Sequence, residues 1–147
     1  MPILLLVLGV TLVDQLAKYY IQKTIALGTS IPVIENIFHI TYILNPGAAF
    51  GILEHKTMFF LGIAAVLLVA LLYIFPRIPR EMTLLRCGIG LMAGGALGNV
   101  IDRARTGMVV DFFDFRIWPI FNIADVAICT GVAAILYTLI FSPHFKD

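Results

Sequence analysis

Four long stretches of the chain consist almost entirely of apolar residues, and they predict four membrane-spanning helices. Each stretch has about the 20 residues that a helix needs to cross a hydrocarbon core of about 30 Å. An even number of crossings puts both ends of the chain on one side of the membrane. We expect an all-α membrane protein of one domain, residues 1–147, with helices at about 3–23, 57–76, 83–102 and 121–141.

The segment that joins the first two predicted helices has a different pattern. Its residues 30–34 and 38–44 are rich in β-branched and aromatic side chains, and a polar Glu35-Asn36 pair separates them. Such runs predict paired strands. We therefore expect a small β-sheet within residues 24–56, on the membrane side opposite the chain ends.

Residues 103–120, which join the third and fourth predicted helices, fall on the same side as this sheet. We expect them to form a loop, and this loop is our candidate for a lid, with Gly107 as its hinge. In the third helix, Gly90, Gly94 and Gly98 recur every four residues. This spacing predicts close contact with a neighbouring helix, and a groove for an acyl chain or an extended peptide is the alternative.

The composition supports a membrane protein and excludes nucleic-acid binding. Hydrophobic residues make up 61% of the chain, and the mean hydropathy is +1.00. A net charge of +1, with no cluster of basic residues, provides no surface for phosphate contacts. Cys87 and Cys129 have neither the number of a disulfide framework nor the spacing of a metal site. We interpret both cysteines as small packing residues.

Carboxylates beside apolar segments are the residues that suggest chemistry. An ionised aspartate near the centre of a spanning helix costs about 2.5–3.5 kcal/mol. Such groups therefore need a partner, exposure at the membrane surface or a catalytic role. Four aspartates raise this question: Asp102, Asp111, Asp114 and Asp125.

Asp111 and Asp125 are the best candidates for a pair that performs acid–base chemistry on one water molecule. Asp111 lies between apolar residues rather than in a polar loop, and Asp125 lies near the start of the fourth helix. Each has a structural alternative. Asp111 could pair with Arg103 or Arg105, and Asp125 could form a helix cap together with Asn122.

Other polar residues in the spanning segments suggest support rather than catalysis. Asp14 and Lys18, four residues apart, have the spacing of a helical ion pair that faces the bundle interior. Asn99, Asp102 and Arg103 predict an internal cluster of hydrogen bonds and ion pairs. No pattern for zinc or for a calcium loop is present, so we expect no metal and no cofactor. His39 is interpreted as an outward-facing strand residue.

The chain resembles the lipoprotein signal peptidases, the type II signal peptidases of bacteria, over nearly its whole length. This resemblance rests on five ordered blocks: DQLAK at 14–18, NPGAAF at 45–50, GGALGNVIDR at 94–103, VVDF at 109–112 and FNIAD at 121–125.

The resemblance implies an aspartic endopeptidase of the bacterial inner membrane, with both termini cytoplasmic and the site near the outer face. Its substrate would be a prolipoprotein carrying diacylglycerol on a cysteine, cut before that cysteine. Besides the substrate, membrane lipids are the expected partners, and a monomer is expected. Asp111 and Asp125 match the catalytic pair. Asn45, Gly47, Asn99, Arg103 and Asn122 match substrate-contacting or site-shaping positions, whereas Asp14, Lys18 and Asp102 match supporting ones.

Two other functions remain open on the residues alone. A small proton- or ion-coupled carrier would use Asp14, Asp102 and Asp125 as a relay, although the chain lacks the internal repeats typical of carriers. A non-catalytic assembly subunit would use the glycine face of the third helix.

Overall fold

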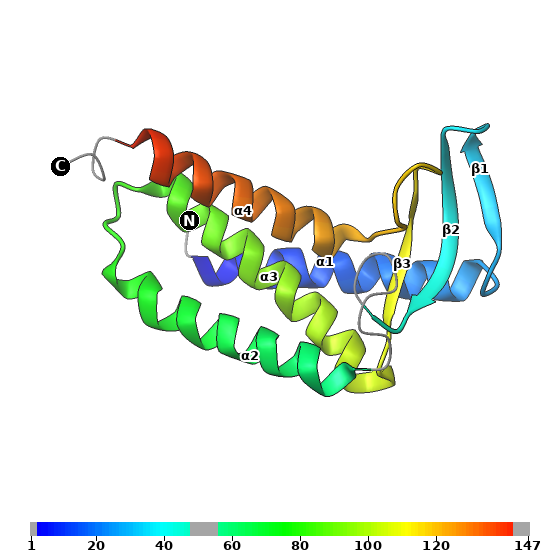
Figure 1. The fold of residues 1–147 in the computed structure, drawn as a ribbon, viewed down its shortest axis with the longest axis horizontal. Helices are drawn as coiled ribbons and strands as arrows, with labels where there is room; N and C mark the ends of the chain where they lie inside the picture. The colour runs from blue at the N-terminus through cyan, green and yellow to red at the C-terminus, as the bar shows by residue number, and fades with distance from the viewer. Residues whose placement is uncertain (1–2, 48–55, 143–147) are drawn as a thin grey trace.

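The computed structural model describes residues 3–47 and 56–142. Four long helices lie side by side, and a small sheet is attached at one end of the bundle (Figure 1). Within the described residues, all four helices are long and apolar enough to cross a membrane, as predicted. They are α1 (Ile3–Thr24), α2 (Thr57–Ile74), α3 (Thr83–Thr106) and α4 (Ile123–Phe141), and a short 3-10 turn, η2 (Phe75–Arg77), follows α2.

Helix α3 is the centre of the bundle, because it packs along both α1 and α4. Glycines make this close packing possible. A methyl group on Gly94 would lie 2.8 Å from Val10 Cβ in α1, and one on Gly88 would lie 2.9 Å from the Gly131 carbonyl oxygen in α4. The predicted close approach of the glycine face is confirmed, and the face contacts α1.

Helix α2 contacts α3 mainly through an apolar cluster at the end of the bundle far from the sheet. This cluster contains Leu71, Met82, Leu85 and Ile89. Most other side chains of α2 are exposed, as expected of a helix that faces lipid. Cys87 and Cys129 are also exposed, so our interpretation of them as packing residues is wrong. A surface that faces lipid accepts small apolar side chains as readily as an interior does.

The sheet has three antiparallel strands in the order β1-β2-β3. The strands β1 (Ser30–Ile34) and β2 (Phe38–Asn45) confirm the predicted hairpin. In Figure 1 the strands run across the direction of the helices, beside the C-terminal half of α1. Their buried side chains Val110 and Phe112 pack with Ile21 of that helix.

The third strand, β3 (Val109–Asp114), corrects the prediction that residues 103–120 are a loop. Its pairing partner, β2, comes from a distant part of the sequence, so local pattern alone did not reveal it. Gly107 lies at the end of a helix and not inside a loop. It ends α3 in the left-handed conformation, with φ of 80°, and its N–H donates to the Arg103 carbonyl oxygen. Residues 109–114 of the candidate lid are thus a paired and largely buried strand.

Candidate active site

Asp111 and Asp125 meet at the residue that begins α4. Asn122 is the N-cap of this helix, and its side-chain amide donates to Asp111 Oδ1 at 2.6 Å. Its side-chain oxygen accepts from the N–H of Asp125 at 3.0 Å, and its own N–H donates to Asp125 Oδ2 at 3.1 Å. The predicted capping box is thus confirmed. This cap holds Asp125 while the same asparagine binds the other carboxylate.

The two carboxylates have different surroundings. Asp111 is only 2% exposed, whereas Asp125 is half-buried. Burial, with a smaller contribution from the negative charge of Asp125, raises the pKa of Asp111 to about 7, although hydrogen bonds from Asn45 and Asn122 oppose the shift. Asp111 therefore retains a proton at pH values where an ordinary aspartate is ionised.

Asn45 approaches Asp111 from the end of β2. Its amide nitrogen donates to Asp111 Oδ2 at 2.9 Å, while its side-chain oxygen accepts from the Gly47 N–H at 3.0 Å. The second contact fixes the orientation of the amide, so that its N–H group points at the carboxylate. In the described part of the chain the partners of the Asp111 carboxylate are asparagines, so the structural alternative of an ion pair with Arg103 or Arg105 is not the arrangement found.

Arg103 instead reaches the segment after β2. Its guanidinium donates to the Gly47 carbonyl oxygen at 2.9 Å and lies over the ring of Phe60, 4.6 Å from its centroid. The side chain thus joins α3 to α2 and to the end of β2, close to the Asp111 side of the site.

Asn99, on α3, connects the carboxylate pair to a buried lysine. Its side-chain oxygen accepts from Lys18 Nζ at 2.9 Å and from Asn122 at 3.2 Å. Because the oxygen faces these donors, its amide nitrogen points to Asp125 Oδ1, at 2.8 Å. The orientation of this amide is therefore set by the lysine and by the helix cap.

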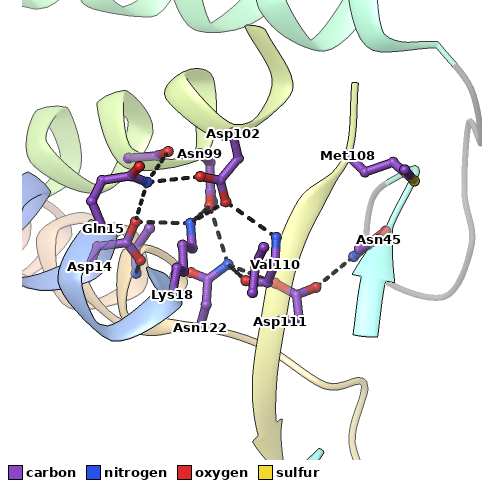
Figure 2. Close-up of polar contacts among 12 residues, drawn as sticks. Asp14, Gln15, Lys18, Asn45, Asn99, Asp102, Met108, Val110, Asp111 and Asn122 are labelled. Atoms are coloured by element: carbon purple, nitrogen blue, oxygen red, sulfur yellow. Dashed lines mark hydrogen bonds and ion pairs between the residues drawn. The ribbon is translucent and has the colours of Figure 1, made fainter. Parts of the chain in front are cut away.

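Lys18 is 1% exposed, and its ammonium group lies 2.9 Å from both Asp14 Oδ2 and Asp102 Oδ2. Figure 2 shows it at the centre of the polar cluster. The predicted ion pair of Asp14 with Lys18 is confirmed. Of the predicted cluster of Asn99, Asp102 and Arg103, the first two both bind Lys18, whereas Arg103 turns toward the end of β2.

The same two aspartates also bind the backbone on either side of the site. Asp14 accepts from the N–H of Ala124 at 2.9 Å, immediately before Asp125. Asp102 accepts from the N–H of Val110 at 3.2 Å, immediately before Asp111. One charged cluster therefore fixes the start of α4 and the strand β3 against α1 and α3.

Sequence reasoning missed Gln15. Its amide donates to Asp102 at 2.8 Å and to the carbonyl oxygen of Gly98 at 3.1 Å, so it bridges α1 and α3 (Figure 2). The available signal was a polar amide beside Asp14 in an otherwise apolar helix. Within residues 3–47 and 56–142, no group of three or more His, Cys, Asp or Glu side chains is arranged to hold a metal ion.

Fold and site together define a polytopic membrane protein with two neighbouring carboxylates at one end of its helical bundle. A family model described as signal peptidase (SPase) II matches residues 6–141. The chain belongs to the signal peptidase II family, and it is therefore a peptidase. Membership and four spanning helices also indicate a multi-pass protein of the bacterial inner membrane.

Individual relatives agree along nearly the full chain. A lipoprotein signal peptidase from Moorella thermoacetica is 49% identical over 140 residues, which cover 95% of this chain and 93% of the relative. One from Pelotomaculum thermopropionicum is 46% identical over 140 residues, covering 95% and 92%. A solved bacterial membrane enzyme superposes with a TM-score of 0.91 at 40% identity, covering 99% of this chain and 91% of that one.

Proposed function

We propose that this protein is an aspartic endopeptidase that removes the signal peptide from diacylglyceryl-modified prolipoproteins by cutting before the lipidated cysteine. The observation that carries the proposal is the shared contact of Asp111 and Asp125 with Asn122. Two carboxylates so close cannot both ionise cheaply, so the pair holds one proton in its working state.

The hydrolysis follows from this single proton. The ionised carboxylate takes a proton from a bound water, and the water oxygen attacks the scissile carbonyl carbon. The protonated carboxylate polarises the carbonyl and later gives its proton to the leaving amine. Asp111 is the more buried member, and burial raises its pKa to about 7. Because the two carboxyls titrate as a unit, the proton belongs to the pair rather than to either residue.

The neighbouring residues have defined parts in this proposal. Asn45 and Asn122 hold Asp111, and Asn99 holds Asp125. Arg103, bound to Gly47 and near enough to feel the charges of both carboxylates, is proposed to contact the substrate together with Gly47. Asp14, Lys18 and Asp102 fix the elements that carry the pair and do not meet the substrate.

The proposed orientation places the sheet on the outer face of the membrane and both termini in the cytoplasm. In support, the start of α1 and the end of α4 lie at the end of the bundle away from the sheet (Figure 1). Exposed Tyr19 and Tyr20 lie near the sheet end of α1, as aromatic residues do at a membrane surface. A site at this level meets a signal peptide that leaves the bilayer, while the diacyl chains stay in lipid.

We propose a monomer, because one chain supplies both carboxylates and the side chains that hold them. The carrier alternative needs Asp14, Asp102 and Asp125 as a proton relay. Asp14 and Asp102 are instead both bound to Lys18, an arrangement that favours fixed charges over proton transfer.

The test uses the detergent-solubilised full chain and a purified diacylglyceryl-modified prolipoprotein, with products measured by mass spectrometry. The expected product begins with the lipidated cysteine. The matched control is the same precursor without diacylglycerol, which we expect to be cut much more slowly. Equal cleavage of both precursors would contradict the lipid requirement, and no cleavage by folded protein would contradict the peptidase proposal.

A further inference from the structure

A row of four hydrogen-bonded side chains crosses the sheet, separate from the candidate active site. Thr41, on β2, donates from its hydroxyl to Asp114 Oδ2 at 2.8 Å. The Thr41 hydroxyl also lies 2.7 Å from Ser30 Oγ on β1, and Ser30 Oγ lies 2.9 Å from His39 Nδ1. The four side chains, called here the sheet chain, connect all three strands.

The sheet chain crosses β2 and β3 where their backbone pairing is interrupted. Ile40 pairs with Phe113 and Ile43 with Asp111, so two residues of β2 lie opposite Phe112 alone. The N–H of Phe112 donates to Phe121 rather than to β2. Thr41 is one of the two β2 residues that lie opposite Phe112 in this bulge. Its hydroxyl therefore connects β2 and β3 where their backbone pairing is interrupted. This connection lies beside the paired residues Ile43 and Asp111.

The hydrogen bonds of the sheet chain can run in only one direction. An ionised Asp114 accepts only, so the Thr41 proton points to it. The proton between Thr41 and Ser30 must then come from Ser30. Ser30 has no second proton to give, so Nδ1–H of His39 donates to its oxygen. His39 Nε2, which is buried without a partner in the described structure, then carries no proton in the neutral ring.

The charge on Asp114 supports this direction. Burial raises the pKa of Asp114, but hydrogen bonds from Thr41 and Arg116 outweigh burial and hold that pKa below its ordinary value. Arg116 contributes its backbone N–H and its guanidinium, each at 2.9 Å. The acceptor end of the sheet chain is therefore ionised across the neutral pH range.

We propose that Asp114 is a positioning residue for Asp111, and that the sheet chain holds β3 in the bulged register that aims Asp111 at the site. Asp114 follows Asp111 by three residues on one strand, so the two side chains point to opposite faces. Asp114 thus acts through the strand and not on the substrate. Bulges beside active sites commonly set the aim of a side chain in this way. The inference rests on the proposed catalytic role of Asp111.

The activity test compares Thr41→Val, Asp114→Asn and their combination. Because misplacement of a catalytic group lowers the chemical step, we expect each single variant to lose about tenfold or more in kcat with little change in KM. The double variant should lose no more than the worse single one, since both break the same chain. Thr41→Ser keeps the hydroxyl and should restore kcat.

The matched control is Thr138→Val, which removes an equally buried hydroxyl far from the sheet, on α4. It should leave kcat near the wild-type value. Unchanged kcat in both single variants, additive losses in the double variant, or a loss confined to KM would each overturn the proposal.

A second measurement needs neither activity nor substitution within the sheet chain. In a variant with His55→Gln and His144→Gln, His39 is the only histidine left of three, and ¹⁵N chemical shifts of its ring at neutral pH identify the tautomer. We expect a proton on Nδ1 and none on Nε2. A ring protonated on Nε2 alone would contradict the proposed direction of the hydrogen bonds in the sheet chain. If the wild type cuts no prolipoprotein, the proposed function fails. The tautomer of His39 still tests the direction of the hydrogen bonds in the sheet chain, because that measurement needs no activity.

Discussion

Asn122 donates a hydrogen bond of 2.6 Å to Asp111 from the N-cap position of α4. The residue at the start of α4, the helix that carries Asp125, therefore also binds the carboxylate of Asp111 on β3. A capping box is usually regarded as purely structural. Here the cap also connects the two residues to which we assign catalysis. A change at the start of α4 should therefore also change the position of the two carboxylates.

The raised pKa of Asp111 predicts the pH dependence of cleavage. The pair must hold one proton to work, and this proton is lost as the pH rises through about 7. We expect kcat/KM to fall above that pH. Removing the hydrogen bond from Asn45, which opposes the shift, should raise the pKa further. The basic limb of Asn45→Ala should therefore lie at higher pH than that of the wild type, and a limb at lower pH would contradict this electrostatic account.

The same shift predicts how stability depends on pH. A carboxyl whose pKa is higher in the folded protein favours folding at low pH, and this contribution is lost as the pH rises from about 4 through 7. Asp111→Asn cannot ionise, so it should gain stability relative to the wild type between pH 5 and pH 8, by at most roughly 3 kcal/mol. Thermal unfolding in detergent at the two pH values measures the gain. Glu35→Gln, at an exposed carboxylate, should show none.

Lys18 should be far more important to stability than the exposed Lys23. Lys18→Met leaves Asp14 and Asp102 buried without their cation, which typically costs about 3–5 kcal/mol. Asp14→Asn, added to Lys18→Met, removes one of the uncompensated charges and should restore part of the loss. Unfolding measurements of the single and double variants test this non-additivity. Lys23→Met is the control, and an equal loss there would show that buried pairing is not the cause.

Gly95 should not tolerate a methyl group. A Cβ at this position would overlap the carbonyl oxygen of Ala124, the residue before Asp125. Gly95→Ala should therefore displace the start of α4, destabilise the protein by about 1–3 kcal/mol and strongly reduce cleavage. Gly62→Ala is the matched control, because nothing lies within 4 Å of its Cβ. Similar behaviour of the two variants would mean that close packing of α3 on α4 does not set the site.

The sequence predicted the helices and the hairpin because both follow from local patterns, namely long apolar stretches and two β-rich runs joined by a turn. Strand β3 was missed, since a run of six residues has no local partner and its pairing with β2 is a long-range event. The strand nevertheless carries Asp111, so the sequence identified the residue without the element that positions it.

The candidate site was predictable to the extent that its residues are costly in their surroundings. Carboxylates beside apolar residues identified Asp111 and Asp125, and helical spacing identified the pair of Asp14 with Lys18. Partners across helices were not predictable. Asp102 and Arg103 are adjacent in sequence but point about 100° apart on a helix, and only the packing of α1 against α3 shows that Asp102 meets Lys18 rather than an arginine.

The central claim is that Asp111 and Asp125 form one catalytic pair. The most direct measurement is the cleavage rate of a diacylglyceryl-modified prolipoprotein by Asp111→Asn and Asp125→Asn, beside wild type and Glu35→Gln, with thermal unfolding to verify that each variant is folded. We predict that both aspartate variants lose cleavage by orders of magnitude while Glu35→Gln retains it. Near wild-type cleavage by a folded form of either aspartate variant would contradict the pair.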